Sequence, residues 1–228
     1  MLSRSYPLLL SLFLLSFETY SSKHNQNPML NKQFKSLVIL LGLLAALLPL
    51  TVSAAPALNP ENTIYLDLPS GRVVIQMLPN IAPRHAARIK ELTRKGFYDG
   101  LTFHRVIPGF MAQTGDPLGD GSGGSGQELK AEFSRMQHIR GTVSMARASD
   151  PNSADSQFFI CFAPAPFLDG KYTVWGQVVS GMEFVDKIKA GSQYNNGTVS
   201  NPTIIVRMKV AADVKPRDSA HPQLPPQN

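Results

Sequence analysis

The sequence predicts a mainly β fold: a closed eight-stranded antiparallel β-barrel with two α-helices over its open ends. Near both ends of the domain, apolar residues alternate with polar ones, which is typical of half-buried strands. Five further short strands are expected between these segments. Two other segments place apolar residues at helical spacing instead, and these are the predicted helices.

The first two strands are expected to form a hairpin. In TIYLDL (63–68) and RVVIQM (72–77) every second residue is apolar, and Pro69-Ser70-Gly71 between them is a turn sequence. Apolar residues alternate again in the last expected strand, at 203–210. The five strands between are expected at 102–106, 111–114, 142–145, 157–162 and 172–179.

The first predicted helix begins at Pro83, which is tolerated in a first turn, and ends at Gly96. The second covers 181–191, where apolar side chains recur at helical spacing before Gly191. Both helices are short, as expected for caps on a barrel rather than for a helical bundle.

The N-terminal part of the chain reads as a targeting segment. In residues 29–55, Lys32 and Lys35 precede an apolar run at 37–50 and then small residues, which is the order of a secretory signal peptide. The run is short for a membrane span, so we expect cleavage rather than stable membrane insertion; a retained anchor is the alternative. Residues 1–28 are interpreted as an extension from a misassigned start before Met29.

The remaining chain is expected to hold a linker at 56–61, one domain at 62–212 and a disordered, proline-rich polar tail at 213–228. Without residues 1–55, Lys+Arg fall from 22 to 18 and Asp+Glu from 16 to 15, which lowers the formal charge from +6 to +3. No basic stripe with interleaved aromatic residues is present, so the sequence does not indicate nucleic-acid binding.

Several kinds of chemistry find no support in the sequence. The five histidines are scattered without metal-ligand spacing, and His104 is expected to pack inside the fold. Ser156 does not lie in a nucleophile elbow, and the glycine-rich loop at 119–127 lacks the spacing of a phosphate-binding loop. Cys161, the single cysteine, is expected to be a buried hydrophobe. Asn196-Gly197 is expected to form a turn rather than a glycosylation site.

Three segments carry a resemblance to a known family. FYDGLTFHRVIPGFMAQTGD (97–116), GTVSMARA (141–148) and SADSQFFICFAPAPFLDGKYTVWGQVVSGMEFVDKI (153–188) together resemble the cyclophilins, which are peptidyl-prolyl cis-trans isomerases. The resemblance extends from about Asn62 to Val210, and GSGGSGQELKAEF (121–133) is similar to the secreted bacterial branch. It implies the eight-stranded barrel with two helices, a periplasmic location, and no metal or other cofactor.

The resemblance also implies site residues. Arg105 matches the catalytic arginine, and the other matched positions form a proline pocket and a groove for the substrate backbone. The positions implied to bind substrate are Phe110, Met111, Gln113, Ala146, Arg147, Ala148, Gln157, Phe159, Phe167, Leu168 and Tyr172. Without the resemblance, the apolar residues among them could be plain core and Arg105 could be a structural ion-pair partner.

Three of these positions depart from the family pattern. Phe167 stands where many members have a tryptophan that contacts cyclosporin, so weak cyclosporin binding is expected. Tyr172 replaces a common histidine, and Arg147 replaces a common asparagine whose main chain contacts the peptide. The expected partners are unfolded or extended proline-containing polypeptides, and the chain is expected to be a monomer. The alternative is a proline-peptide binding module or tethered scaffold with little turnover.

Overall fold

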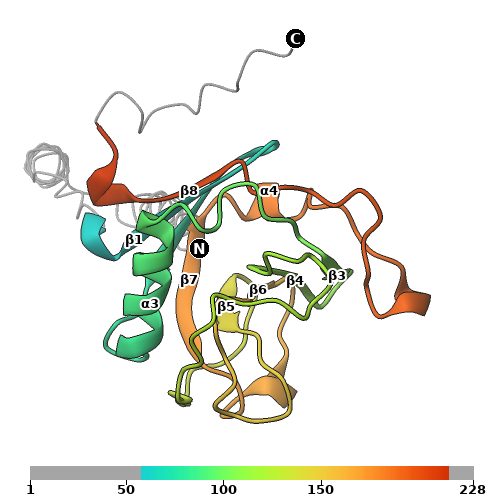
Figure 1. Cartoon of the computed structure of the whole chain (residues 1–228), viewed down its shortest axis with the longest axis horizontal. Helices are drawn as coiled ribbons and strands as arrows, with labels where there is room; N and C mark the ends of the chain where they lie inside the picture. The colour runs from blue at the N-terminus through green and yellow to red at the C-terminus, as the bar shows by residue number, and fades with distance from the viewer. Residues whose placement is uncertain (1–57, 216–228) are drawn as a thin grey trace, which may run out of the picture. The chain divides into compact units, whose positions relative to one another are not determined.

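The computed structural model describes residues 58–215, so the predicted signal peptide and residues 1–28 lie outside the described residues, as does all but the start of the predicted tail. Eight strands and two α-helices make up the fold (Figure 1). The strands are β1 (Thr63–Leu68), β2 (Gly71–Met77), β3 (Arg105–Ile107), β4 (Met111–Thr114), β5 (Thr142–Met145), β6 (Phe158–Cys161), β7 (Val174–Ser180) and β8 (Arg207–Val210). The helices are α3 (Pro83–Arg94) and α4 (Met182–Val185). Within residues 58–215, no helix is long and apolar enough to cross a membrane.

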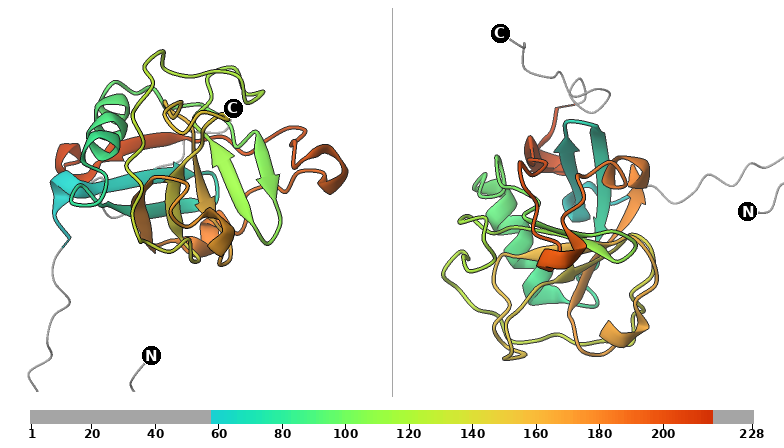
Figure 2. Two further views of the ribbon diagram at one scale, coloured as in Figure 1. Left: turned by 90° about the horizontal axis from the view of Figure 1, so that it is seen from below. Right: turned by 90° about the vertical axis from the view of Figure 1, so that its right-hand side faces the viewer.

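All eight strands belong to one antiparallel sheet with the order β3-β4-β6-β5-β7-β2-β1-β8. The sheet curls so that its two ends face the same interior, as Figure 2 shows from two further sides. The predicted mainly β architecture of eight antiparallel strands with two helices is therefore confirmed. The predicted positions of the strands agree with the structure to within a few residues, except that β8 begins only at Arg207.

The predicted closure of the barrel is not confirmed, because the sheet is open between β3 and β8. Two isolated bridges, Thr102 to Ile204 and Arg105 to Thr198, join β3 and the segment before it to the segment that precedes β8. Asn201 has a positive φ of 52° and Pro202 follows it, so the chain bends just before it reaches β8. Pro202 lacks an N–H donor, and the two bridges lie on either side of this bend instead of forming one continuous ladder.

The first hairpin forms as its sequence predicts, with Leu68 paired to Gly71 across the turn. Gly71 has a φ of 143°, and a Cβ at this position would lie 2.6 Å from the ring of Phe184. A side chain at Gly71 would therefore displace the Phe184 ring of α4. In the main core, the fully buried Phe158 meets both Tyr98 and Trp175 edge to face, at ring-centroid distances of 5.6 and 5.4 Å.

The N-terminus of α3 is capped by a residue distant in sequence. The helix begins after Ala82, whose side chain cannot cap, and the Glu132 carboxylate accepts hydrogen bonds from the N–H groups of Arg84 and His85 instead. The buried His85 ring also meets this carboxylate, with 2.7 Å between Nδ1 and Oε2. The glycine-rich loop that leads to Glu132 is thereby fixed against α3.

The second helix is shorter than predicted. α4 ends at Val185, although a helix was expected over 181–191. The following N–H groups of Lys187 and Ile188 donate to carbonyls three residues earlier, so the chain continues as tight turns rather than as α-helix. At the domain ends, Glu61 in the predicted linker and Asp213 at the start of the predicted tail both hydrogen-bond Arg94.

Candidate active site

A small apolar cluster lies apart from the main core. Its buried members are Met111, Phe159, Cys161, Ala165 and Leu168, and Ile107, Phe110, Ala146 and Tyr172 pack against it while remaining partly exposed. β4 and β6 form the floor, because the ladder pairs Met111 with Cys161 and Gln113 with Phe159. The structure thus brings together the residues that the sequence assigns to the proline pocket.

Aromatic rings border this cluster. Tyr172 meets Phe159 edge to face, with 5.9 Å between the ring centroids. The ring centroids of Phe110 and Phe167 lie 5.3 Å apart. Phe167 is 60% exposed, whereas its neighbour Leu168 is 6% exposed. Phe167 therefore stands at the exposed edge of the apolar cluster, and Leu168 is buried within it.

Arg105 stands beside this cluster on the edge strand β3. Its Nη1 donates to Gln113 Oε1 at 3.1 Å, its Nε to the Asn196 carbonyl at 2.9 Å, and its Nη2 to Asn196 Oδ1 at 3.0 Å. All three acceptors are neutral oxygens. Partial burial lowers the pKa of Arg105 from its ordinary value, while Tyr172 acts in the opposite direction. The guanidinium still remains charged at any working pH.

Asn196 is a site residue that the sequence does not reveal. The Asn-Gly pair forms the expected turn, and Asn196 and Gly197 both have positive φ values, 48° and 81°. The turn brings the carbonyl and the side-chain amide of Asn196 together on one side of Arg105. A turn signal in the sequence predicts the bend but not the residue that the bend faces.

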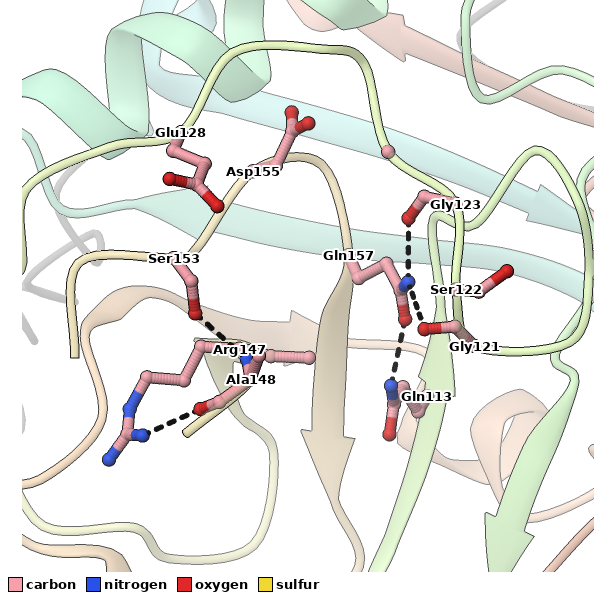
Figure 3. A pocket seen from close by; sticks show the side chains of 12 residues that line it. Gln113, Gly121, Ser122, Gly123, Glu128, Arg147, Ala148, Ser153, Asp155 and Gln157 are labelled. Atoms are coloured by element: carbon pink, nitrogen blue, oxygen red, sulfur yellow. Dashed lines mark hydrogen bonds between the residues drawn. The ribbon is translucent and has the colours of Figure 1, made fainter. Parts of the chain in front are cut away.

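A chain of hydrogen bonds leads away from Arg105 through Gln113, and Figure 3 shows the part of it from Gln113 onward. Gln113 Nε2 donates to Gln157 Oε1 at 2.9 Å, and Gln157 Nε2 donates to the carbonyls of Gly121 and Gly123 at 3.0 and 2.8 Å. Each amide therefore has a fixed orientation, since the donor of one meets the acceptor of the next. The arginine and the glycine-rich loop are coupled through two glutamines.

A pocket opens beside these two glutamines. It has a volume of about 290 Å³, and Figure 3 shows it between the glycine-rich loop and the segment around Ala148. We call it the glycine-loop pocket. Its lining residues are Gln113, Gly121, Ser122, Gly123, Gly124, Glu128, Ala146, Arg147, Ala148, Ser153, Asp155 and Gln157.

The segment Ala146–Ala148 runs between the two pockets. The N–H of Ala146 donates to the Gln157 carbonyl, and the N–H of Ala148 donates to Ser153 Oγ, both at 2.9 Å. Within the described part of the chain, the N–H of Arg147 has no hydrogen-bond partner. A peptide lying along this segment would therefore find its main-chain donor at Arg147.

Two residues behind the apolar cluster support it. His138 Nδ1 lies 2.9 Å from Asp169 Oδ1, its Nε2 lies 3.0 Å from Ser144 Oγ, and its ring stacks on Phe159. The His138 N–H also donates to Asp169, and these two bonds lower the pKa of that carboxyl. His138 was not singled out by the sequence, because a lone histidine carries no pattern.

Two expectations about buried polar groups can be compared with the structure. Cys161 is fully buried, as expected, and burial raises the pKa of its thiol to about 12. His104 is also buried, as expected, and its burial lowers the pKa of the ring. Among residues 58–215, no three His, Cys, Asp or Glu side chains gather in a way that could hold a metal ion.

Comparison with known proteins agrees with this geometry. Residues 63–210 match the family model described as cyclophilin type peptidyl-prolyl cis-trans isomerase/CLD. A probable peptidyl-prolyl cis-trans isomerase of Brucella suis is 53% identical over 176 residues, which cover 72% of this chain and 90% of that protein. Peptidyl-prolyl cis-trans isomerase B of Bacillus subtilis is 44% identical over 132 residues, covering 57% of this chain and 92% of that protein.

Solved structures give the same result. The crystal structure of cyclophilin AquaCyp293 from Hirschia baltica matches with a TM-score of 0.63 at 28% identity, over 70% of this chain and 77% of that one. A cyclophilin type peptidyl-prolyl cis-trans isomerase of Cryptosporidium parvum, crystallised in the presence of the dipeptide Ala-Pro, matches with a TM-score of 0.60 at 27% identity. The match covers 65% of this chain and 98% of that one.

Proposed function

The chain belongs to the cyclophilin-type peptidyl-prolyl cis-trans isomerases, and from this premise we propose that Arg105 carries its isomerase reaction and that the reaction assists the folding of exported proteins. The observation that carries the first proposal is the position of Arg105. It is a charged guanidinium beside an apolar pocket of suitable composition for a proline ring, and only neutral oxygens hold it.

The reaction requires rotation about an X-Pro amide, whose C–N resonance sets a barrier of about 18–20 kcal/mol. As the bond twists, resonance is lost and the prolyl nitrogen gains a lone pair that can accept a hydrogen bond. A donor placed at that nitrogen stabilises the twisted state more than either planar isomer, and this difference accelerates the reaction. Neither a covalent intermediate nor a net proton transfer is needed.

Arg105 has N–H groups available to donate to this nitrogen. A guanidinium carries more N–H groups than the three engaged with Asn196 and Gln113, so within residues 58–215 one N–H on each of Nη1 and Nη2 has no partner. Preorganised donors of this kind contribute about 2.7–4 kcal/mol, or 10²–10³ in rate. Phe110, Met111 and Leu168 would hold the proline ring while the preceding residue turns.

The test is cis-trans exchange of an Ala-Pro peptide, measured by NMR with residues 56–228 of the chain and with its Arg105→Ala variant. We expect fast exchange that falls by about 10² or more in the variant, the loss of one preorganised donor group. Wild-type exchange at the uncatalysed rate, with the peptide still bound, would identify a binding module and contradict the enzymatic role.

The natural substrates would be unfolded or extended segments with accessible X-Pro bonds, met by a monomeric protein in the periplasm. This proposal rests on the signal-peptide pattern at 29–55. N-terminal sequencing of the exported chain tests it: a start at Ala55 or Pro56 supports it, and retention of residues 29–55 would favour a tethered protein. Weak cyclosporin inhibition is expected from Phe167 on the pocket rim, and nanomolar inhibition would contradict this expectation.

A further inference from the structure

The turn that holds Arg105 is built from the single Asn-Gly pair of the sequence, Asn196-Gly197. It lies in the segment between α4 and β8, which runs beside β3 (Figure 1). Asn196 is exposed, its φ of 48° is left-handed, and both its Oδ1 and its main-chain carbonyl accept from Arg105. Asparagine suits this position because it tolerates the left-handed region and carries a short, neutral side-chain carbonyl.

The next position requires glycine. Gly197 has a φ of 81°, and a Cβ there would lie 2.6 Å from Ile107 Cγ1 and 3.1 Å from the Val106 carbonyl oxygen. The N–H of Val106 also donates to the Gly197 carbonyl at 2.8 Å, so the backbone of the turn lies directly against β3. The site therefore calls for asparagine to hold Arg105, followed by a residue without a Cβ.

An asparagine followed by glycine can react with its own backbone. The nitrogen of the glycine, once deprotonated, attacks the side-chain amide carbon of the asparagine. A new C–N bond closes a succinimide ring, and the side-chain amide nitrogen leaves as ammonia. Water then adds to one of the two ring carbonyls and opens the ring, which gives aspartate or isoaspartate. Glycine hinders the ring closure least because it has no side chain, and water is the only co-reactant.

Two contacts in the turn act on this reaction in opposite directions. Arg105 Nη2 donates to Asn196 Oδ1 at 3.0 Å, so a cation polarises the amide and stabilises the oxyanion that forms on attack. The Gly197 N–H donates to the Ser192 carbonyl at 2.8 Å, and this bond must open before the nitrogen can lose its proton. Ser192 and Asn195 are exposed, as is Asn196, so the turn can open without unfolding the core.

We propose that Asn196 is a site of spontaneous deamidation, and that its conversion to aspartate or isoaspartate slows the isomerase by pairing Arg105 with a carboxylate. The inference rests on the proposed function, since it assumes that the Arg105 guanidinium carries the reaction. In the aspartate form a carboxylate replaces Oδ1 beside Nη2 and cancels much of the field of the guanidinium. In the isoaspartate form an extra backbone methylene also displaces the carbonyl that accepts from Nε.

The experiment ages residues 56–228 at alkaline pH and follows two quantities in the same samples. Peptide mapping by mass spectrometry gives the fraction of Asn196 converted, and NMR gives the exchange rate of an Ala-Pro peptide. We expect Asn196 to convert faster than any other asparagine of residues 56–228. The fractional loss of catalysed exchange should follow the fraction converted.

Substitutions connect the chemical change to Arg105. Asn196→Asp, made directly, should slow the catalysed exchange by about five- to fiftyfold, less than the 10²–10³ attributed to a preorganised donor. In an Arg105→Ala background the same substitution should have no further effect, because no guanidinium remains to be paired. A merely structural role of Asn196 would instead lower the activity in both backgrounds.

Asn201 supplies the matched control. It is also exposed and left-handed, with a φ of 52°, but Pro202 follows it. A proline nitrogen has no proton to lose, so the ring-closing attack is blocked at this position. Asn201 should therefore stay intact while Asn196 converts, and Asn201→Asp should exchange the peptide at the wild-type rate.

The outcomes separate this inference from the proposed function. The inference is overturned if Asn196 stays intact in the folded chain after the chain in denaturant has converted, or if the converted protein keeps the wild-type exchange rate. If unaged wild type does not catalyse exchange, the proposed function fails, and the effect on activity fails with it. The mass measurement then still decides whether Asn196 is a deamidation site, because it does not depend on catalysis.

Discussion

Replacing Arg105 by lysine separates the charge of this residue from its shape. Lysine keeps the positive charge but has one nitrogen, whereas Arg105 uses three nitrogens on the Asn196 carbonyl, Asn196 Oδ1 and Gln113 Oε1. A lysine nitrogen at this site can keep one of those acceptors, and any donor aimed at the substrate would then compete with it. We therefore expect Arg105→Lys to lose most of the catalytic advantage although the net charge is unchanged.

The size of the loss follows from the bonds. Hydrogen bonds to charged groups contribute about 1.5–3 kcal/mol each, and the lower value applies because Arg105 is partly exposed. Two lost bonds correspond to about 3 kcal/mol, and each ~1.4 kcal/mol changes a rate tenfold. If between half and all of this loss is felt in the transition state, kcat/KM falls by about 10- to 10²-fold.

The assay is NMR exchange of an Ala-Pro peptide with wild type, Arg105→Lys and Arg105→Ala at one pH and ionic strength. Arg94→Lys is the matched control. Arg94 lies at the end of α3, where it pairs with Glu61 and Asp213, so the same change should leave activity unaltered. Activity of Arg105→Lys within threefold of wild type would refute the reasoning, since charge alone would then suffice. Activity equal to that of Arg105→Ala would show that the fork geometry is essential.

Three further predictions concern the surroundings of the site and the N-terminal cap of α3. Tyr172→Ala should raise KM by about two- to tenfold with little change in kcat, because it removes one aromatic contact to Phe159; a fall in kcat alone would contradict this. Cys161, with its pKa raised to about 12, should resist thiol reagents at pH 8 in the folded chain and react in denaturant; rapid labelling of the native protein would show that the cluster opens. Burial lowers the pKa of His85 from 6.5, so the unfolded state binds that proton first and the free energy of unfolding should fall below about pH 6.5. Burial alone would raise the pKa of Glu132, but its bonds to His85 and the helix N-terminus lower it from 4.5. The free energy of unfolding should therefore fall a second time as pH falls through the lowered value. Denaturation at several pH values should show that Glu132→Gln removes this second fall and keeps the first.

The strands β1, β2 and β8 could be predicted from the sequence because each is a local alternation of apolar and polar residues. The hairpin of β1 and β2 is the clearest case, since the turn and both strands lie within fifteen residues of one another. The closure of the sheet could not be predicted in this way. It depends on whether two strands distant in sequence meet, and here β3 and the segment before it bridge to Thr198 and Ile204 rather than to β8.

The candidate site could likewise be predicted only where its residues are close in sequence. Met111 and Gln113 are two residues apart on one strand, so their common face follows from the pleat. Asn196 and His138 reach the site from other segments, and nothing near them in the sequence indicates what they contact. The orientation of the Arg147 side chain could not be predicted either, because it depends on the ring of Tyr172 and the carbonyl of Lys171.

The neutral partners of Arg105 bear directly on its proposed role. Arg94 and Arg140 pair with carboxylates, which cancel much of their field at short range. A carboxylate beside Arg105 would hold the side chain equally well, but it would compete with the weakly basic prolyl nitrogen for the same protons. Asn196 and Gln113 position the guanidinium through dipoles and leave its net charge in place. Gln113 is in turn fixed by Gln157 and the glycine-rich loop, so the arginine remains both oriented and unneutralised, which is the combination that stabilises a transient lone pair.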